Sequence, residues 1–128
     1  MILDSSAVVA VVFREPGHEE LDQKMRDAEI LGIGAPTLVE TGMVLIGKYG
    51  DAAKTTIARF RESLDIVVVP FDVAHFEAAA EAFGRFGKGH HPAGLNYGDC
   101  MTYAVARVAH EPLLYVGNDF ARTDIERA

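Results

Sequence analysis

The segment DIVVVP (residues 65–70) places four β-branched apolar residues in a row between an aspartate and a proline. β-Branched side chains favour extended backbone, and proline is poorly tolerated inside a sheet. A run that is apolar on both faces is typical of a strand inside a parallel sheet that helices cover on both sides. The segment therefore predicts an inner strand of an α/β domain.

Three more short apolar segments, at residues 1–4, 30–35 and 113–117, predict further strands of the same sheet. Between these segments, apolar residues recur at helical spacing and are bounded by capping residues, prolines and glycines. The predicted helices cover residues 7–13, 18–28, 36–49, 52–64, 72–86 and 97–109. Short strands that alternate with helices predict an α/β domain with a parallel sheet.

Several polar residues are placed to cap these helices. We expect Ser5 or Ser6 to cap the first helix, because serine hydroxyls accept hydrogen bonds from the free N–H groups of a first turn. We expect Asp51 and Asp72 to do the same for the helices that follow them.

The composition is that of a globular protein of 128 residues, 49% apolar and 24% charged, with a net charge of −7. We expect one domain over residues 1–128, and the single cysteine, Cys100, excludes an internal disulfide. With no secretory leader and no run of ~20 apolar residues, a cytoplasmic protein without membrane contact is expected. The acidic balance counts against a passive binder of nucleic acid, but not against an enzyme whose metal ions offset it.

Two aspartates stand where α/β domains form their binding sites, at the carboxyl edge of the sheet, and a third lies at the start of a helix. Asp4 ends the first predicted strand, and Asp119 lies just past the fourth. Asp99 falls in the first turn of a helix for which Asn96, three residues earlier, is the expected cap. Taken singly, a turn or capping role is the simpler explanation of each aspartate.

Glu40 has no such local explanation, because it lies in mid-helix within residues 38–47, which contain no other charge. We expect its side chain to be at least partly buried, and burying an unpaired carboxylate is costly or keeps it protonated. Two explanations stay open. Glu40 either forms a salt bridge with one of the twelve lysines and arginines, or it is a metal ligand or a base beside a metal.

A single site explains the four acids together; it would gather Asp4, Glu40, Asp99 and Asp119. Converging carboxylates need cations, and oxygen ligands of this kind suit Mg²⁺ or Mn²⁺, with positions left for water and a phosphate. A metal ion lowers the pKa of a bound water and neutralises charge on a phosphate, so this arrangement suits phosphodiester hydrolysis.

Four stretches of the chain carry a resemblance to a known family. They are MILDSSA (1–7), APTLVETG (35–42), LNYGDCMTYAVA (95–106) and LLYVGNDFARTDI (113–125). In this order they resemble a PIN-domain ribonuclease, specifically a VapC toxin of a bacterial type II toxin–antitoxin system. The resemblance spans almost the whole chain and implies a three-layer α/β/α sandwich with a central, mainly parallel sheet of four to five strands.

The resemblance also implies Mg²⁺-dependent endoribonuclease activity, with Mn²⁺ as a substitute, on structured RNA such as tRNA or rRNA. In this family the first-strand aspartate and the aspartate of the NYGD stretch are the principal metal ligands, here Asp4 and Asp99, and Glu40 completes the acidic triad. Asp119 is our choice for a fourth acid, although many relatives carry Gly-Asp-Asp-Phe where this chain has GNDF (117–120). If the first of those two positions normally acts as the fourth acid, Asn118 would instead hold a water or a phosphate by hydrogen bonding. A one-metal mechanism then stays open.

Partners follow from the same resemblance: a homodimer, a VapB antitoxin whose C-terminal segment covers the active site, and operator DNA contacted only through that antitoxin. Ser6 and Asn96 are expected to support the site. The residues before the Asp99 helix either contact the RNA backbone or form a solvated loop; they are Arg85, Lys88, His90 and His91.

Two other hypotheses compete with the ribonuclease. A receiver-like signalling module also gathers acids around Mg²⁺, but it normally pairs two adjacent acids early and uses a late lysine, and the last lysine here is Lys88. A protein that works only through a partner surface gives no reason to place Glu40 inside an apolar helix. The ribonuclease hypothesis therefore ranks first.

Overall fold

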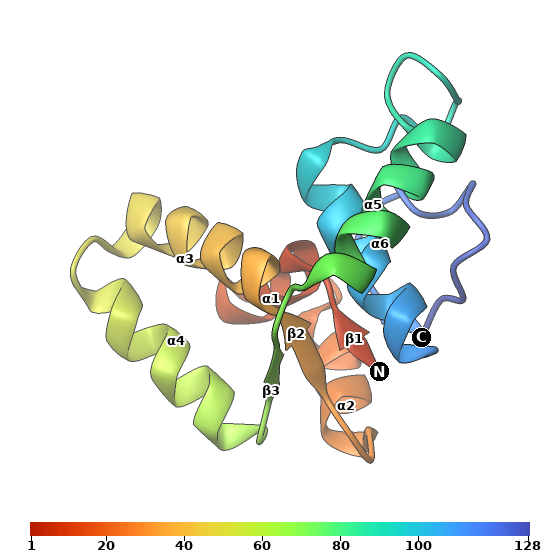
Figure 1. The fold of residues 1–128 in the computed structure, drawn as a ribbon. Helices are drawn as coiled ribbons and strands as arrows, with labels where there is room; N and C mark the ends of the chain where they lie inside the picture. Colours follow the sequence, from red (N-terminus) through yellow and green to blue (C-terminus); the bar gives the residue numbers. More distant parts are fainter.

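The computed structural model describes residues 1–128 as short strands that alternate with helices (Figure 1). The strands are β1 (Ile2–Leu3), β2 (Gly32–Gly34), β3 (Val67–Val69) and β4 (Leu113–Leu114). The helices are α1 (Ser5–Val12), α2 (His18–Asp27), α3 (Ala35–Tyr49), α4 (Ala52–Ser63), α5 (Val73–Phe86) and α6 (Tyr97–Ala109). Every predicted strand and helix is present, with bounds that differ from the prediction by a few residues.

The four strands form one parallel sheet in the order β3-β2-β1-β4. Ile2 of the inner strand β1 lies opposite Gly32 of β2 on one side and opposite Leu113 of β4 on the other. Near the C-terminus, Arg127 adds a further bridge to Leu113. The prediction of an α/β fold around a parallel sheet is confirmed.

The segment 65–70, which indicated a parallel sheet, lies at its edge. Strand β3 pairs with β2 alone, and Val67 is 54% exposed. Val68 and Val69 pack against the hydrophobic clusters on opposite faces of the sheet, which accounts for the apolar pattern. The prediction of an inner strand was wrong, because an apolar pattern reports which faces are covered and not which strands have two neighbours.

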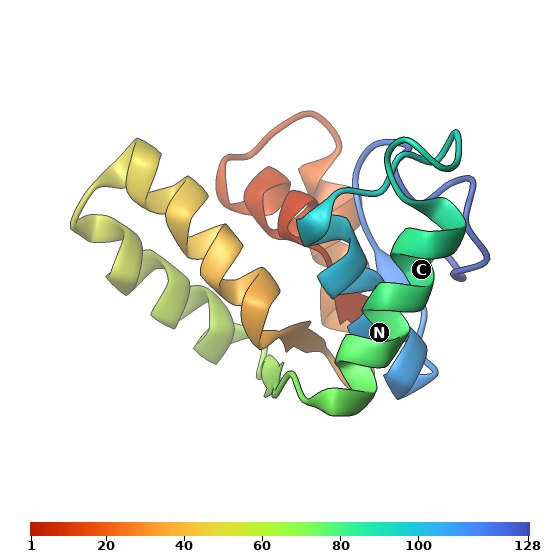
Figure 2. The same ribbon diagram turned by 45° about the horizontal axis from the view of Figure 1, so that its top comes forward.

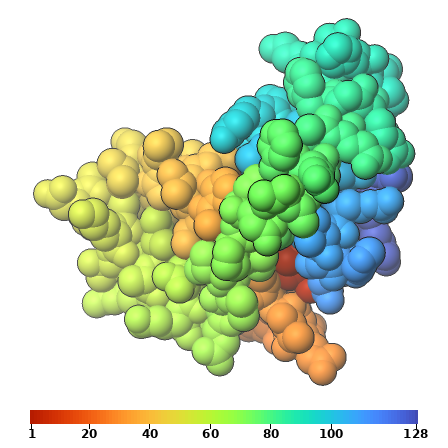
Figure 3. Space-filling model, in the orientation of Figure 1, coloured from red at the N-terminus to blue at the C-terminus, as the bar shows by residue number.

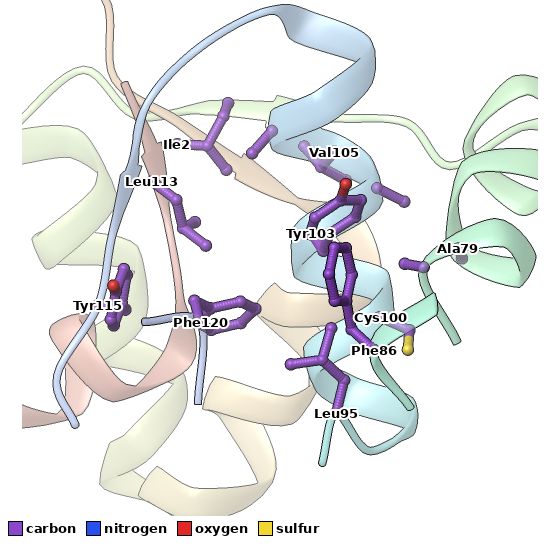
Figure 4. Packing of buried hydrophobic residues seen from close by; sticks show 13 residues of the cluster. Ile2, Ala79, Phe86, Leu95, Cys100, Tyr103, Val105, Leu113, Tyr115 and Phe120 are labelled. Carbon is purple, nitrogen blue, oxygen red and sulfur yellow. The ribbon is translucent and has the colours of Figure 1, made fainter. Parts of the chain in front are cut away.

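Two hydrophobic layers cover opposite faces of the sheet, because successive strand residues point in opposite directions. Ile2 and Leu113 belong to a cluster with side chains of α5 and α6 (Figure 4). Leu3 and Leu114, the next residues in each strand, belong to a second cluster with side chains of α1 and α2. The result is the expected three-layer α/β/α sandwich.

Helices α3 and α6, which carry two of the predicted acids, pack closely at β2. A Cβ on Gly34 would lie 2.8 Å from Cγ2 of Val105, so glycine permits the close approach of α6 to the strand. The buried hydroxyls of Thr37 and Thr102 are hydrogen-bonded at 2.9 Å and join α3 to α6. These contacts hold α3 and α6 against each other at the carboxyl end of β2.

The helix caps agree in part with prediction. Asp72 caps α5 by accepting a hydrogen bond from the N–H of Ala74 at 3.1 Å, as expected. Asp51 precedes α4, but its side chain accepts no capping bond, so that prediction was wrong. The prediction that serine caps α1 was also wrong: the helix begins at Ser5, and Asp4 therefore occupies the cap position.

Helices α3 and α4 stand out from the rest of the molecule as a pair (Figures 1 and 3). In Figure 3 the cyan first turn of α6 lies between this pair and α5, and Figure 2 shows the same turn beside α1. None of the six helices combines the length and the apolar composition that crossing a membrane requires.

Candidate active site

Asp4 lies at the carboxyl end of β1 with 7% of its surface exposed. Its carboxylate accepts hydrogen bonds from the backbone N–H of Ser6 at 3.0 Å and from the Ser6 hydroxyl. The same hydroxyl oxygen accepts a hydrogen bond from the N–H of Val116 at 3.0 Å. Ser6 therefore orients Asp4 and ties the end of β1 to the segment that follows β4.

Asp99 lies in the first turn of α6 and forms a capping box with Asn96, as predicted. The N–H of Asn96 donates to the Asp99 carboxylate at 2.9 Å, and the N–H of Asp99 donates to the Asn96 side-chain oxygen at 2.9 Å. Burial raises the pKa of Asp99 from 3.8 to about 6, although the Asn96 hydrogen bond opposes the shift. The charges of Asp119, Asp4 and Glu40 raise this pKa further, so all four predicted acids interact.

Glu40 is exposed over most of its length, and only its carboxylate end is partly desolvated, so the expected partial burial holds at that end alone. Its neighbours in the charge-free stretch face solvent too: Met43 is 68% exposed and Val39 59%. The stretch lacks charges because it is an apolar surface of α3, and not because it lies in the core. No salt bridge of the chain includes Glu40, so the structure does not support that explanation of the residue.

The carboxylate end of Glu40 lies against the first turn of α6. A Cβ on Gly98 would lie 2.9 Å from Oε2 of Glu40 and 3.1 Å from Oε1, so glycine leaves room for the carboxylate. Desolvation at this contact raises the pKa of Glu40, the charge of Asp4 raises it further, and a hydrogen bond from Ser5 lowers it. The Glu40 side chain is thus exposed along its methylene groups and crowded at its carboxylate.

Asp119 and Asn118 lie on the loop after β4, and both are exposed. The next residue, Phe120, is buried, and its ring centroid lies 5.1 Å from that of Tyr115, which anchors the loop to the core (Figure 4). A cleft of about 500 Å³ opens beside this loop; it is lined by Pro92, Ala93, Asn118, Asp119, Ala121 and Arg122. Asn118 and Asp119, the two candidates for the fourth acidic position of the site, therefore line the same cleft.

The four acids offer only oxygen ligands, which hard divalent cations such as Mg²⁺ prefer. In this structure no group of three or more histidine, cysteine, aspartate or glutamate side chains is close enough to hold a metal ion. The acids nevertheless raise the pKa values of Asp99 and Glu40 through like charge, and a bound cation would relieve that repulsion. Their chemistry therefore fits a divalent cation.

Arg85, predicted as an RNA contact, forms an ion pair with Asp124 at 3.0 Å. Asp124 also accepts a hydrogen bond from the hydroxyl of the buried Tyr103 at 2.6 Å. Burial and this hydrogen bond raise the pKa of Tyr103 to about 12, and the same bond lowers the pKa of Asp124. The network ties the C-terminal segment to α5 and α6, and no sequence pattern indicated it.

The other three predicted RNA contacts lie on the loop between α5 and α6. Lys88 and His90 are exposed, and His91 is half-buried. The ring of His90 packs edge-on against Phe83, with centroids 5.3 Å apart, and that of His91 packs in the same way against Phe86 at 5.3 Å. Both histidines thus have structural contacts, whereas the Lys88 side chain forms no ion pair.

Comparison with known proteins gives matches over nearly the whole chain. The family model of the PIN domain matches residues 1–126. Ribonuclease VapC36 of Mycobacterium tuberculosis is 46% identical over 127 residues, which cover 98% of this chain and 91% of the relative. A ribonuclease VapC of Mycolicibacterium smegmatis is 35% identical over 125 residues, which cover 98% of this chain and 97% of that relative.

Solved structures share the fold. VapC20 of Mycobacterium tuberculosis, described as a sarcin–ricin loop cleaving toxin, has a TM-score of 0.79 at 18% identity and matches 99% of this chain and 97% of its own. VapBC2 from Rickettsia felis, bound to a DNA fragment from its promoter, has a TM-score of 0.76 at 14% identity, with 98% and 94% matched.

The fold is an α/β domain whose parallel sheet has acids at its carboxyl edge, and the family model covers residues 1–126. The chain therefore belongs to the PIN-domain family. Within that class it groups with the VapC ribonucleases, to which it is 46% and 35% identical, so it is an enzyme of the hydrolase type. The resemblance seen in the sequence is confirmed, and these matches favour the nuclease over the receiver-like hypothesis.

Proposed function

We propose that the chain is a Mg²⁺-dependent endoribonuclease and the toxin of a VapBC toxin–antitoxin module. The observation that carries the proposal is geometric: Asp4 follows strand β1 directly, and the carboxylate of Glu40 lies against the first turn of α6, which bears Asp99. Acids that crowd one another at the carboxyl edge of an α/β sheet are typical of a site that binds a cation and a phosphate. Relatives at 46% identity are named ribonucleases, which supports RNA as the substrate.

In this proposal Asp4 and Asp99 hold the metal ion, with Glu40 and Asp119 completing the acidic set. When bound, Mg²⁺ supplies charge neutralisation for the phosphate and lowers the pKa of a water molecule. Glu40 is placed to take the proton of the attacking water, because its carboxylate lies against the first turn of α6, which bears Asp99. Attack on phosphorus breaks the bond to the 3′ oxygen, leaving a 5′-phosphate and a 3′-hydroxyl.

The proposed substrate is a structured RNA, such as a tRNA or an rRNA, and the name of the VapC20 structure supports this class. The proposed partners are a second copy of the chain and a VapB-type antitoxin, through which operator DNA is contacted. The VapBC complexes among the solved structures support the antitoxin. Large apolar side chains left exposed on α3 and α5 support a binding surface; they include Met43, Ile46, Val73 and Phe76.

The test is cleavage of total cellular RNA by the purified chain, with Mg²⁺ and with EDTA. Asp4→Asn and Asp99→Asn keep the capping oxygen and remove one charge each, so they isolate the chemistry from the fold. We expect each to lower activity at least ~100-fold, as the loss of one important charge in a site does. Glu62→Gln, on the exposed surface of α4, is the matched control and keeps full activity. Cleavage that survives EDTA and both substitutions would contradict the proposal.

A further inference from the structure

The cleft beside Asp119 shares that residue with the candidate active site, so it adjoins the site on the side of the loop after β4. Its volume of about 500 Å³ falls in the range of pockets that hold small organic ligands, roughly 300–1,000 Å³. Its two walls come from different loops: Pro92 and Ala93 from the segment before α6, and residues 118–122 from the segment after β4. A nucleotide joined to a phosphate bound at the acids has this cleft within reach.

Arg122 is the one cation that lines the cleft. It is exposed and forms no salt bridge, in contrast to Arg85 and Arg26, which pair with Asp124 and Asp22. An arginine left without a carboxylate partner three residues from Asp119 is free to bind an anion. Guanidinium groups bind phosphate oxygens through two parallel hydrogen bonds.

The backbone around Arg122 is held in place. The N–H of Ala121 donates to the carbonyl of Asn118 at 3.1 Å, and the N–H of Thr123 donates to the carbonyl of Phe120 at 3.0 Å. The Thr123 hydroxyl donates to that same carbonyl at 2.8 Å. Because Phe120 is buried, the loop presents Arg122 from a fixed base and has less freedom to lose when a ligand binds.

The opposite wall is apolar and also ordered. The Nδ1 atom of His91 accepts a hydrogen bond from the N–H of Ala93 at 3.1 Å, and the N–H of Gly94 donates to the carbonyl of His91 at 3.0 Å. The ring of Pro92 and the methyl group of Ala93 form an uncharged surface, against which a ribose or a base can pack. Asn118 adds one amide that both donates and accepts hydrogen bonds.

We propose that this cleft is a subsite for the nucleotide adjacent to the scissile phosphate of an RNA strand. Arg122 binds the next phosphate along the strand, Asn118 bonds the sugar or base edge, and Pro92 with Ala93 supports its apolar face. The inference rests on the proposed ribonuclease function. In a chain of net charge −7, an unpaired arginine beside the acids supplies the positive charge that an RNA backbone needs close to the site.

The experiment measures RNA binding by fluorescence anisotropy, with a fluorescein-labelled single-stranded oligoribonucleotide and Ca²⁺ in place of Mg²⁺ to prevent cleavage. Wild type is compared with Arg122→Ala, Arg122→Lys and Arg59→Ala between 50 and 200 mM salt. Arg59 is an exposed arginine of α4 that forms no salt bridge and lines no part of the cleft, so its removal matches the change in net charge.

We expect Arg122→Ala to weaken binding about tenfold, as the loss of one arginine–phosphate contact does. We also expect the slope of the logarithm of the binding constant against the logarithm of salt concentration to become shallower by about 0.7. Arg122→Lys retains the slope and recovers part of the affinity, and Arg59→Ala behaves as wild type. With Mg²⁺ and cellular RNA, Arg122→Ala raises KM with little change in kcat. Absence of wild-type binding, or equal behaviour of Arg122→Ala and Arg59→Ala, overturns the subsite. A lack of Mg²⁺-dependent cleavage while the Arg122→Ala binding defect persists overturns only the proposed function.

Discussion

Asp99 shows how one residue serves a helix cap and a charged site at once. Its backbone N–H and its carboxylate close the capping box with Asn96, and the charges of three other acids raise the pKa of the same carboxylate. A first-turn position therefore explains where α6 begins, and it also places the carboxylate at the end of the helix that Glu40 contacts. Capping and chemistry are compatible because the capping box uses one carboxylate oxygen.

Replacing Asp99 by asparagine should stabilise the metal-free protein at neutral pH. The folded-state pKa of Asp99 is about 6 against 3.8 when unfolded, so the stability it contributes is fully present below pH 3.8 and is lost as pH rises through 6. Asparagine stays neutral and keeps the oxygen that caps Asn96. Allowing for partial exposure, we expect Asp99→Asn to gain ~1–2 kcal/mol at pH 7.5 in EDTA and nothing near pH 4. Urea unfolding at both pH values measures this, and a wild type that is at least as stable at pH 7.5 contradicts it.

Gly98 makes room for the carboxylate of Glu40 in a way that a single methyl group tests. A Cβ there would lie 2.9 Å from Oε2, so Gly98→Ala displaces the carboxylate while favouring the helix by up to ~1 kcal/mol. We expect RNA cleavage to fall roughly 10–100-fold with no loss of stability, since small displacements at reacting groups are costly. Gly47→Ala on α3 is the matched control, because its added Cβ meets nothing within 4 Å. Equal activities of the two variants would show that Glu40 needs no exact placement.

At the scale of elements, the C-terminal segment is held to α5 and α6 by the hydroxyl of Tyr103, the carboxylate of Asp124 and the guanidinium of Arg85. The same α6 carries Asp99 one turn before Tyr103. One helix therefore presents an acid to the site and holds the segment that follows Asp119.

Tyr103→Phe removes the hydrogen bond and leaves the ring in the core. We expect a loss of ~1–2 kcal/mol at pH 7, because a bond to a charged acceptor is broken. The pKa of Asp124 is lowered by this bond, so the stabilisation is present above pH 3.8 and is lost as pH falls through the folded-state pKa. Urea unfolding at pH 7 and pH 3 checks both statements. Tyr49→Phe is the control, since the exposed Tyr49 hydroxyl forms no hydrogen bond; an equal loss in that variant would sink the explanation.

At the scale of the whole molecule, a net charge of −7 with four acids in the candidate site leads us to expect that stability depends on cations. Mg²⁺ at ten times its dissociation constant adds ~1.4 kcal/mol to the free energy of unfolding, so we expect a rise of several degrees in Tm. Asp4→Asn lowers the rise, and Glu62→Gln keeps it. Thermal melts with Mg²⁺, with EDTA and with NaCl at equal ionic strength separate specific binding from screening. A rise that NaCl reproduces in full argues against the metal site.

Local sequence patterns predicted most of the fold. The order of the strands and helices, the capping by Asp72 and Asn96, the positions of Asp4 and Asp119 after their strands, and the first-turn position of Asp99 all follow from features a few residues long. Apolar spacing, caps and helix-ending residues act within one or two turns of backbone. They are therefore visible in a single sequence.

Only the tertiary structure decided the rest. It placed β3 at the sheet edge, left Glu40 exposed with its carboxylate against Gly98, and joined Tyr103 to Asp124. It also showed the cleft at Arg122, whose walls come from two separate loops. The physical reason is common to all of these features. Strand order, close approach and hydrogen bonds between distant segments depend on how the layers pack together, and no local pattern of residues contains that information.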